Sequence, residues 1–482
     1  MRYAGILTSI LITLVFYGCQ TGPKQGEVTK INASNIDKFC LQHDVAVTKD
    51  GLLLKNPLSS ITSQFNVRNF ELTAKLKTTE GAEGILIFDA TDAASTADGY
   101  EVKINNSDYR IGNLQKTGSL AKVRNNFVRT ATDNQWFTLG VSVKGNHIQV
   151  VVNDKMVCEY DEPANVERAG DISGRVLREG RVVIRRSNGK GELLLQEINI
   201  KPLTAEQTGQ NYPATRDSLT KIVDRLNDQE FPLIDFHTHL KGGLTMDQAY
   251  THAHQIGCNY GVAANCGLKF PVTSDSTLIA YFNGISKEPV FKAMQCEGRE
   301  WVTLFSPQAV ARFDYIFTDA MTWTDMKGRR MRLWIPEETF IDDEQKFMDM
   351  LVCKIEAILS QEPVDIHANP TYLPAKLAPD YDRLWTGERM DRVIKVLKDN
   401  DVALEINARF KIPSITFIKR AKAAGVKFSF GTNNGSNNDL GRMEYCLKAI
   451  REAGLTGADM FIPRPANEKK VIKSGLPSKI TG

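Results

Sequence analysis

The sequence lacks the patterns that mark several large classes of protein. It has no long run of lysine or arginine, and 60 basic residues against 57 acidic ones leave a net charge of only +3. Without a basic stripe, nucleic acid is not an expected partner. No CxxC pair or Cys/His zinc knuckle occurs, so neither a redox pair nor a zinc finger is indicated.

Cysteine is also too sparse and too irregular for a disulfide framework. Seven cysteines follow residue 19, an odd number without paired spacing. Most are therefore expected to be buried free thiols. They are Cys40, Cys158, Cys258, Cys266, Cys296, Cys353 and Cys446.

The N-terminus has an apolar run, from Ile6 to Phe16, that follows Arg2. About 11 residues are too few to span a bilayer but suit the core of a signal peptide. Gly18-Cys19 resembles a bacterial lipoprotein cleavage site. We therefore expect a signal peptide at 1–18, a lipid on Cys19 and a tether at 19–37. The absence of Asp at position 20 favours the outer membrane, facing the periplasm. An ordinary secretory signal with an incidental cysteine is the alternative.

The region 38–203 alternates apolar and polar residues with a period of two. Phe70, Leu72, Ala74 and Leu76 alternate with charged and polar residues, and Gly/Asn turns separate such runs. Short alternating strands without intervening helices are typical of a β-sandwich. We predict an all-β, concanavalin-like sandwich here.

The pattern changes after a polar linker at 204–230. Between 231 and 465, short apolar strands such as Val402–Ile406 alternate with stretches of helical period. Thr245 is expected to cap one helix that Gly257 closes, and Pro413 to open another. This alternation predicts a multidomain chain whose second domain is an α/β (β/α) barrel, followed by a C-terminal tail at 466–482.

Four short segments in the sandwich region occur in an order typical of one family. They are Gly99–Ile104, Thr117–Leu120, Asn134–Phe137 and the closing Gln196–Leu203. Together they resemble the 3-keto-disaccharide hydrolase domain, which includes 3-keto-glycoside lyases and hydratases. That resemblance implies a carbohydrate substrate. A ketone at C3 acidifies the C2 proton, so that a modest base can remove it and the C1 substituent leaves.

Glu101 and Lys103 are the candidate catalytic residues of this domain. Residues two apart in a strand share a face, so the two side chains are expected to lie together. A plain solvated strand face is the alternative. The chain also departs from the family at Asn105-Asn106 and at Arg185-Arg186, which favours a domain that binds sugar without processing it.

A His-x-His pair, His237 and His239, follows the first expected barrel strand. Both imidazoles should face one side at the carboxyl end of the barrel, which is a frequent start of a metal site. The arrangement of the later strands resembles the polymerase and histidinol phosphatase (PHP) family of metal-dependent phosphoesterases. The resemblance implies further metal ligands at Glu297, Asp319, His367 and Glu405.

Several of that family's ligand positions carry asparagine or cysteine here, as at Asn265-Cys266, Asn369 and Asn433-Asn434. An amide is a much weaker ligand than a carboxylate or imidazole, so a trinuclear centre is not expected. One Zn or Mn ion is the most that the remaining donors would hold. Asn369, Asn407 and Asn433 are expected to contact substrate instead.

Two functions remain open. The first is an envelope-anchored enzyme of glycan catabolism, which opens (3-keto-)glycosidic bonds by lyase, hydratase or hydrolase chemistry and has a single-metal hydrolase-like barrel. The second is a carbohydrate-binding lipoprotein whose barrel is a pseudoenzyme. In both, the membrane is contacted through the lipid anchor only.

Overall fold

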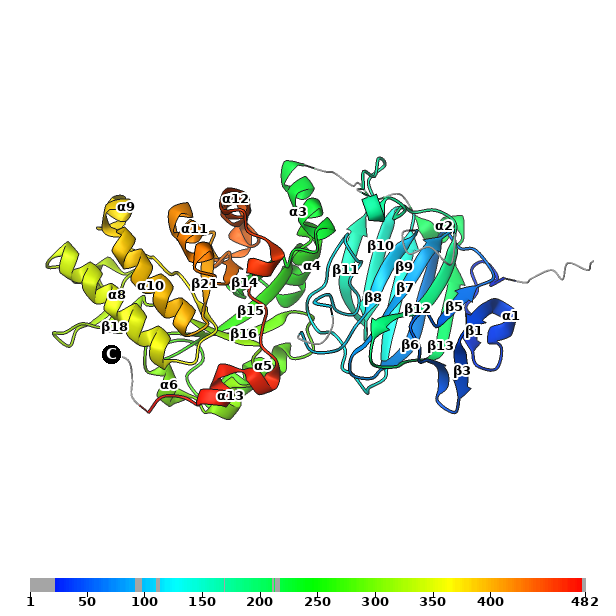
Figure 1. Cartoon of the computed structure of the whole chain (residues 1–482), viewed down its shortest axis with the longest axis horizontal. Helices are drawn as coiled ribbons and strands as arrows, with labels where there is room; N and C mark the ends of the chain where they lie inside the picture. The colour runs from blue at the N-terminus through cyan, green and yellow to red at the C-terminus, as the bar shows by residue number, and fades with distance from the viewer. Residues whose placement is uncertain are drawn as a thin grey trace, which may run out of the picture.

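The computed structural model describes residues 22–91, 98–109, 113–168, 170–209, 212 and 217–478. Two domains, one of strands and one of mixed strands and helices, lie side by side along the long axis (Figure 1). Cys19 and the expected signal peptide lie outside the described residues. Within the described ranges, no helix is both long and apolar enough to cross a membrane.

The first domain consists of two antiparallel sheets packed face to face. The larger has the order β11-β10-β9-β6-β13-β4-β3, with β1 also paired to β13, and the smaller has the order β2-β5-β12-β7-β8. The strands are β1 Thr29–Asn32, β2 Cys40–His43, β3 Val45–Thr48, β4 Gly51–Leu54, β5 Ser60–Ser63, β6 Phe70–Thr78, β7 Ala82–Ala90, β8 Tyr100–Ile104, β9 Phe137–Lys144, β10 His147–Val152, β11 Lys155–Asp161, β12 Arg181–Gly189 and β13 Leu193–Pro202; the short helix α1 is Ile36–Phe39.

The two sheets pack because apolar residues at every second position give each of the longer strands one apolar face. In β6 every second side chain is buried, from Phe70 to Thr78, because alternate residues of a strand point to opposite faces. Phe70 from one sheet meets Phe88 from the other with ring centroids 5.8 Å apart. The expected sandwich is therefore observed.

The boundary expected at residue 38 is wrong. Thr29–Asn32 forms β1, which pairs along its whole length with β13. Ile31 is 2% exposed and belongs to the sandwich core. A single buried side chain in a short polar segment gives too weak a periodicity to be recognised, so the expected tether ends before Thr29.

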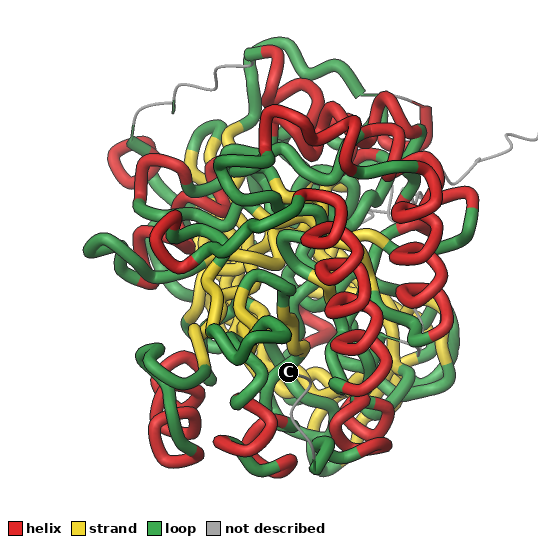
Figure 2. Tube along the Cα trace, turned by 90° about the vertical axis from the view of Figure 1, so that its left-hand side faces the viewer, coloured by secondary structure: helices red, strands yellow, loops and turns green. Residues whose placement is uncertain are grey.

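The second domain is a closed barrel of seven parallel strands in the order β14-β15-β16-β17-β20-β21-β22. Figure 2 looks at this end of the molecule and shows strands in the middle with helices outside. The strands are β14 Ile234–Thr238, β15 Asn259–Cys266, β16 Phe291–Cys296, β17 Tyr315–Thr318, β20 Ile366–His367, β21 Ala403–Asn407 and β22 Phe428–Gly431, and a hairpin of β18 Thr322–Thr324 and β19 Arg330–Arg332 follows β17. The helices are α4 Met246–Ile256, α5 Asp275–Ile285, α6 Trp301–Leu304, α7 Pro307–Val310, α8 Glu344–Gln361, α9 Tyr381–Leu384, α10 Gly387–Asp399, α11 Ile415–Ala423, α12 Glu444–Ala453 and α13 Lys470–Ser474.

The helix boundaries follow the expected capping residues with one correction. Thr245 caps α4 with its side chain, and Gly257 ends that helix in the left-handed conformation. Pro413 does not open α11: the helix begins at Ile415 and Ser414 caps it. Ser414 is the better N-cap because its hydroxyl accepts a hydrogen bond from the Phe417 N–H in the first turn of the helix.

The regions expected to be linker and tail are partly helical. The linker carries α2 (Ala205–Thr208) and α3 (Ser218–Asp228). The tail carries α13, whose Val471 is 1% exposed. Next to it, Lys470 Nζ donates to the carbonyls of Val364 and Asn400. The first part of the tail therefore belongs to the barrel domain.

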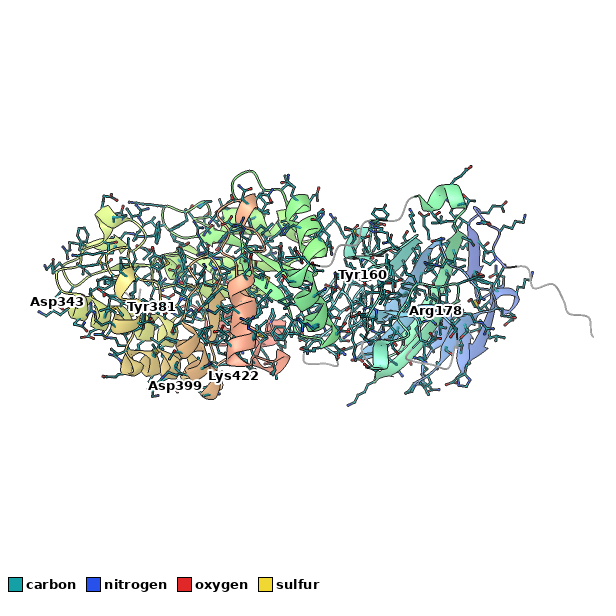
Figure 3. All side chains as sticks on the ribbon, turned by 90° about the horizontal axis from the view of Figure 1, so that it is seen from above. Tyr160, Arg178, Asp343, Tyr381, Asp399 and Lys422 are labelled. Atoms are coloured by element: carbon teal, nitrogen blue, oxygen red, sulfur yellow. The ribbon has the colours of Figure 1, made fainter. Side chains whose placement is uncertain are left out.

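A loop of the sandwich closes the end of the barrel at which the strands begin. Phe127 and Val128 share one apolar cluster with Phe236 and Phe291 of the barrel. The Phe127 amide donates to Asn259 Oδ1, at the first residue of β15. Figure 3 labels Tyr160 on the side of the sandwich that faces the barrel and Tyr381 toward the opposite end.

Candidate functional site

Glu101 and Lys103 lie together on the outer face of the five-stranded sheet, as expected. Lys103 Nζ is 3.7 Å from Glu101 Oε2. Arg175 Nη2 donates to the same oxygen at 2.9 Å, from a loop 74 residues away. Glu101 is 7% exposed, and the Lys103 side chain is 25% exposed. The Glu101 carboxylate thus lies between two cations. Of these, the Lys103 side chain is partly exposed to solvent, whereas the Arg175 side chain is buried.

Three of the residues at which the sequence departs from the family that it resembles have structural roles. Asn105 Nδ2 donates to the carbonyls of Asn113 and Gln115, and Asn106 accepts from the Thr117 hydroxyl. Arg186 donates to the carbonyls of Gly189 and Gly191. These hydrogen bonds hold the loops beside β8 and β12, because buried polar groups are costly unless they are paired.

In the barrel, His237 and His239 stand at the end of β14 with ring centroids 5.1 Å apart. His239 Nδ1 lies 3.1 Å from the Ala263 carbonyl. A carbonyl oxygen only accepts, so the proton is on Nδ1 and Nε2 carries a lone pair. Burial, and then the nearby charge of His237, lower the pKa of His239 well below its ordinary value. The Nε2 atoms of both histidines are buried and have no hydrogen-bond partner among the residues that the structure describes.

Two buried carboxyl groups, Glu297 and Asp319, directly follow strands β16 and β17. Glu297 Oε1 accepts from Asn265 Nδ2 at 3.1 Å, and Asp319 Oδ2 accepts from Asn369 Nδ2 at 3.0 Å. Burial, and next the charge of Asp319, raise the pKa of Glu297. Burial likewise raises the pKa of Asp319. The two groups thus lie near enough to oppose each other's ionisation.

Glu405 does not line the cavity described below; it is buried and orients the residues around it. Its carboxylate accepts from His237 Nδ1, from the Asn369 amide and from Asn407 Nδ2. Burial raises the pKa of Glu405, but the charge of His237 and these hydrogen bonds bring it below its ordinary value. Gly431 is required beside it, since a Cβ there would lie 2.1 Å from Glu405 Oε1.

The three predicted asparagines form one network, although only two face a cavity. Asn369 Oδ1 accepts from Asn407 Nδ2 at 2.9 Å and from Asn433 Nδ2 at 3.1 Å. Asn369 and Asn433 line the cavity described next, whereas Asn407 is completely buried behind them. His367 is also completely buried, and neither of its ring nitrogens has a hydrogen-bond partner in the described part of the chain.

A cavity of about 590 Å³ opens at this end of the barrel, with Glu297 and Asp319 in its wall. Sequence reasoning missed the residues that complete it. Gln295, in β16 and two residues before Glu297, could have been found from the shared face of a strand; Lys241 and the others come from loops without a pattern. The missed lining residues include Gln295, Lys241, Arg409, Trp334, Tyr372 and Phe410.

The barrel offers donors suited to a metal ion, but not a preformed centre. Within the ranges that the structure describes, no group of three His, Cys, Asp or Glu side chains is arranged to hold a metal. The unpartnered Nε2 atoms of His237 and His239 nevertheless fit such an ion in chemistry, because a ligating histidine donates its other ring N–H to a carboxylate or a carbonyl.

Comparison with known proteins concerns the first domain. Residues 23–201 match the 3-keto-alpha-glucoside-1,2-lyase-like domain family, so the chain has an N-terminal 3-keto-disaccharide hydrolase-like domain. This match ends before the barrel begins. No curated protein matches the sequence.

Among solved structures, the chain is similar to a Parabacteroides distasonis protein assigned as a glycosyl hydrolase, with 17% identity and a TM-score of 0.32, over 37% of this chain and all of that one. It is also similar to the carbohydrate-binding module CBM66 from Bacillus subtilis, with 14% identity and a TM-score of 0.24, over 38% and 98% of the two chains. A third, β-agarase A from Zobellia galactanivorans, has 11% identity and a TM-score of 0.27, over 39% and 96%.

Proposed function

We propose that this protein is an enzyme of glycan catabolism that opens the glycosidic bond of 3-keto-glycosides. The observation that carries the proposal is the match of residues 23–201 to a 3-keto-alpha-glucoside-1,2-lyase-like family. Glu101 and Lys103, adjacent on the outer face of one sheet, supply a carboxylate and a cation for that chemistry.

In the proposed reaction Glu101 accepts the C2 proton of the keto-sugar. The electrons of the C2–H bond form a C1–C2 double bond, and the C1 substituent leaves as an alkoxide that is protonated to the alcohol. Lys103 stabilises the negative charge that develops on the C3 oxygen. Arg175 is a positioning residue, since its hydrogen bond orients the Glu101 carboxylate. Addition of water to the same double bond is the matching hydration.

The test compares a 3-keto-glucoside of an aryl alcohol with the plain aryl glucoside. Release of the aryl alcohol is expected from the keto compound only, because the unoxidised sugar has no acidified C2 hydrogen. Glu101→Gln should lower kcat by roughly 10²- to 10⁴-fold, the usual contribution of a general base. Glu71→Gln, on the other sheet and paired with Lys144, is the matched control.

Two outcomes would contradict the proposal. The first is that wild type releases alcohol from neither substrate, and the second is that Glu101→Gln is as active as Glu71→Gln. Inactivity together with measurable oligosaccharide binding would instead favour the carbohydrate-binding lipoprotein with a pseudoenzyme barrel. The asparagines that replace expected ligands at Asn369 and Asn433 support that alternative.

A second candidate function is a PHP-like, single-metal hydrolase site in the barrel. It is favoured by the two buried Nε2 atoms of His237 and His239 that lack partners. Glu297 and Asp319 would complete the donor set, and Glu405 would orient His237. A bound Zn or Mn would supply an activated water and polarise an ester or amide carbonyl.

A further inference from the structure

The barrel cavity is lined by the kinds of side chain that recognise sugars. Trp334, which follows the β18–β19 hairpin, lines it and is 37% exposed. Tyr372 and Phe410 form a second aromatic wall, with ring centroids 4.9 Å apart at 67°. Rings of this kind offer flat apolar faces, and the C–H face of a pyranose ring is apolar too.

The same cavity is also lined by fixed amides and carboxyl groups. Asn265 Nδ2 bridges Gln295 Oε1 at 2.8 Å and Glu297 Oε1 at 3.1 Å. Asn369 donates to Asp319 and accepts from Asn433. Pre-formed pockets with a few convergent polar groups are typical of small-molecule sites, and adjacent donors and acceptors match the vicinal hydroxyls of a sugar.

The charges in the cavity favour an uncharged ligand. The wall carries acidic and basic groups side by side, with Glu297 and Asp319 beside Lys241 and Arg409. A phosphate here would meet two buried carboxyl groups, which repel it whenever they are ionised. A sugar hydroxyl, in contrast, can pair with a carboxyl group in either of its protonation states.

We infer that the mouth of the barrel is a second carbohydrate site, which binds an uncharged saccharide with Trp334 as its stacking platform. The choice of ligand class rests on the proposed glycan function. Because the sandwich closes the opposite end of the barrel through Phe127, this site is separate from Glu101 and binds sugar independently of it.

The chain reports on this site through its own fluorescence. Trp301, Trp323 and Trp385 are buried, and Trp136 lies in the other domain beneath Lys77. Of these five residues, Trp334 is the one that lines the cavity. Binding of cellotriose or maltotriose to the full chain should therefore protect Trp334 from acrylamide quenching.

Trp334→Ala should weaken the binding of the better trisaccharide, measured by calorimetry, roughly tenfold or more, as truncation of an aromatic anchor does. Met326→Ala is the matched control. Met326 lies in the turn of the same hairpin, is 96% exposed and does not line the cavity. The affinity of the Met326→Ala variant for the trisaccharide should equal that of wild type.

Three results would overturn the inference: no protection of Trp334 by either trisaccharide, equal affinities of the Trp334→Ala and Met326→Ala variants, or tighter binding of glucose 6-phosphate than of glucose. The aryl 3-keto-glucoside assay on the same preparations separates the two proposals. Trisaccharide protection without alcohol release retains the barrel site and removes the proposed reaction. Alcohol release without protection does the reverse.

Discussion

His237 Nδ1 lies 2.5 Å from Glu405 Oε1, and each of the two side chains is 2% exposed. The contact joins the first barrel strand to the sixth, and it fixes the orientation of the imidazole ring. Glu405 is itself held by Asn369 and Asn407. The free Nε2 of His237 is therefore held in one direction before any ligand arrives, which lowers the entropy cost of binding one.

The first prediction concerns the metal content of the barrel. If His237 and His239 are ligands, elemental analysis of protein purified without chelators and supplied with Zn or Mn should find about one ion per chain. A His237→Ala/His239→Ala variant should lose that ion. The variant should remain folded by circular dichroism, because the Asn369 backbone N–H and Asn407 Nδ2 still donate to the buried Glu405 carboxylate.

His252→Ala is the matched control, since that histidine bonds Tyr260 on the outside of the barrel and should not affect metal content. Wild type without metal after this treatment would contradict the ligand assignment and support the pseudoenzyme interpretation.

The second prediction concerns Glu297 and pH. Its pKa is raised in the folded protein, above about 4.3 in the unfolded chain. The stability that the protonated group provides is thus present at acidic pH and lost as pH rises through the folded pKa. In metal-free protein, Glu297→Gln should be more stable than wild type at pH 8, by on the order of 2 kcal/mol. The difference should disappear toward pH 4.

Urea unfolding in the presence of a chelator measures this difference. A wild type that is as stable as the variant at pH 8 would show that the carboxylate is not buried against Asp319. Repeating the measurement with Zn tests the ligand role, because a metal ion that binds Glu297 would reverse the order of the two proteins.

The longer strands of the sandwich could be predicted where one face is buried and the other is not. In β6 and β9, apolar and polar residues therefore alternate over nine and eight residues. Strand β1 has four residues and one buried side chain, Ile31, so nothing in its pattern separates it from a polar segment.

The site could be predicted in part for a similar reason. His237 lies in β14 and His239 directly follows it, and Glu405 stands on another strand, so spacing and order identify them. Arg175, Arg409 and Trp334 come from loops, where no period relates one residue to the next. Their approach depends on the closure of the sheet and the barrel, which a local pattern does not contain.

The third prediction concerns Cys19, which the structure does not describe. Gly18-Cys19 follows the apolar run Ile6–Phe16, so we expect lipid on Cys19 and retention in the outer-membrane fraction. Cys19→Ala should release the protein from membranes, whereas Cys353→Ala, a change at an exposed cysteine, should not. Membrane retention of the Cys19→Ala protein, with no labelled lipid on wild type, would refute the anchor.

The last prediction concerns the junction of the two domains. Phe127 belongs to the sandwich but is 2% exposed within a cluster of barrel residues. Its loop is also tied to the barrel side by Asn125 Nδ2, which donates to the Asn227 carbonyl at 2.8 Å. The sandwich therefore contributes a buried side chain to the apolar core of the barrel.

Phe127→Ala should lower the free energy of unfolding of the barrel by about 3 kcal/mol, the cost of truncating a buried phenylalanine. Trp301, Trp323 and Trp385 are buried in the barrel, so their fluorescence during urea unfolding follows that domain. Phe88→Ala is the matched control. It removes an equally buried ring from between the two sheets, away from the junction, and should weaken the sandwich first. If the tryptophan-reported midpoint of Phe127→Ala equals that of wild type, the barrel is stable alone and the sandwich is only attached to it.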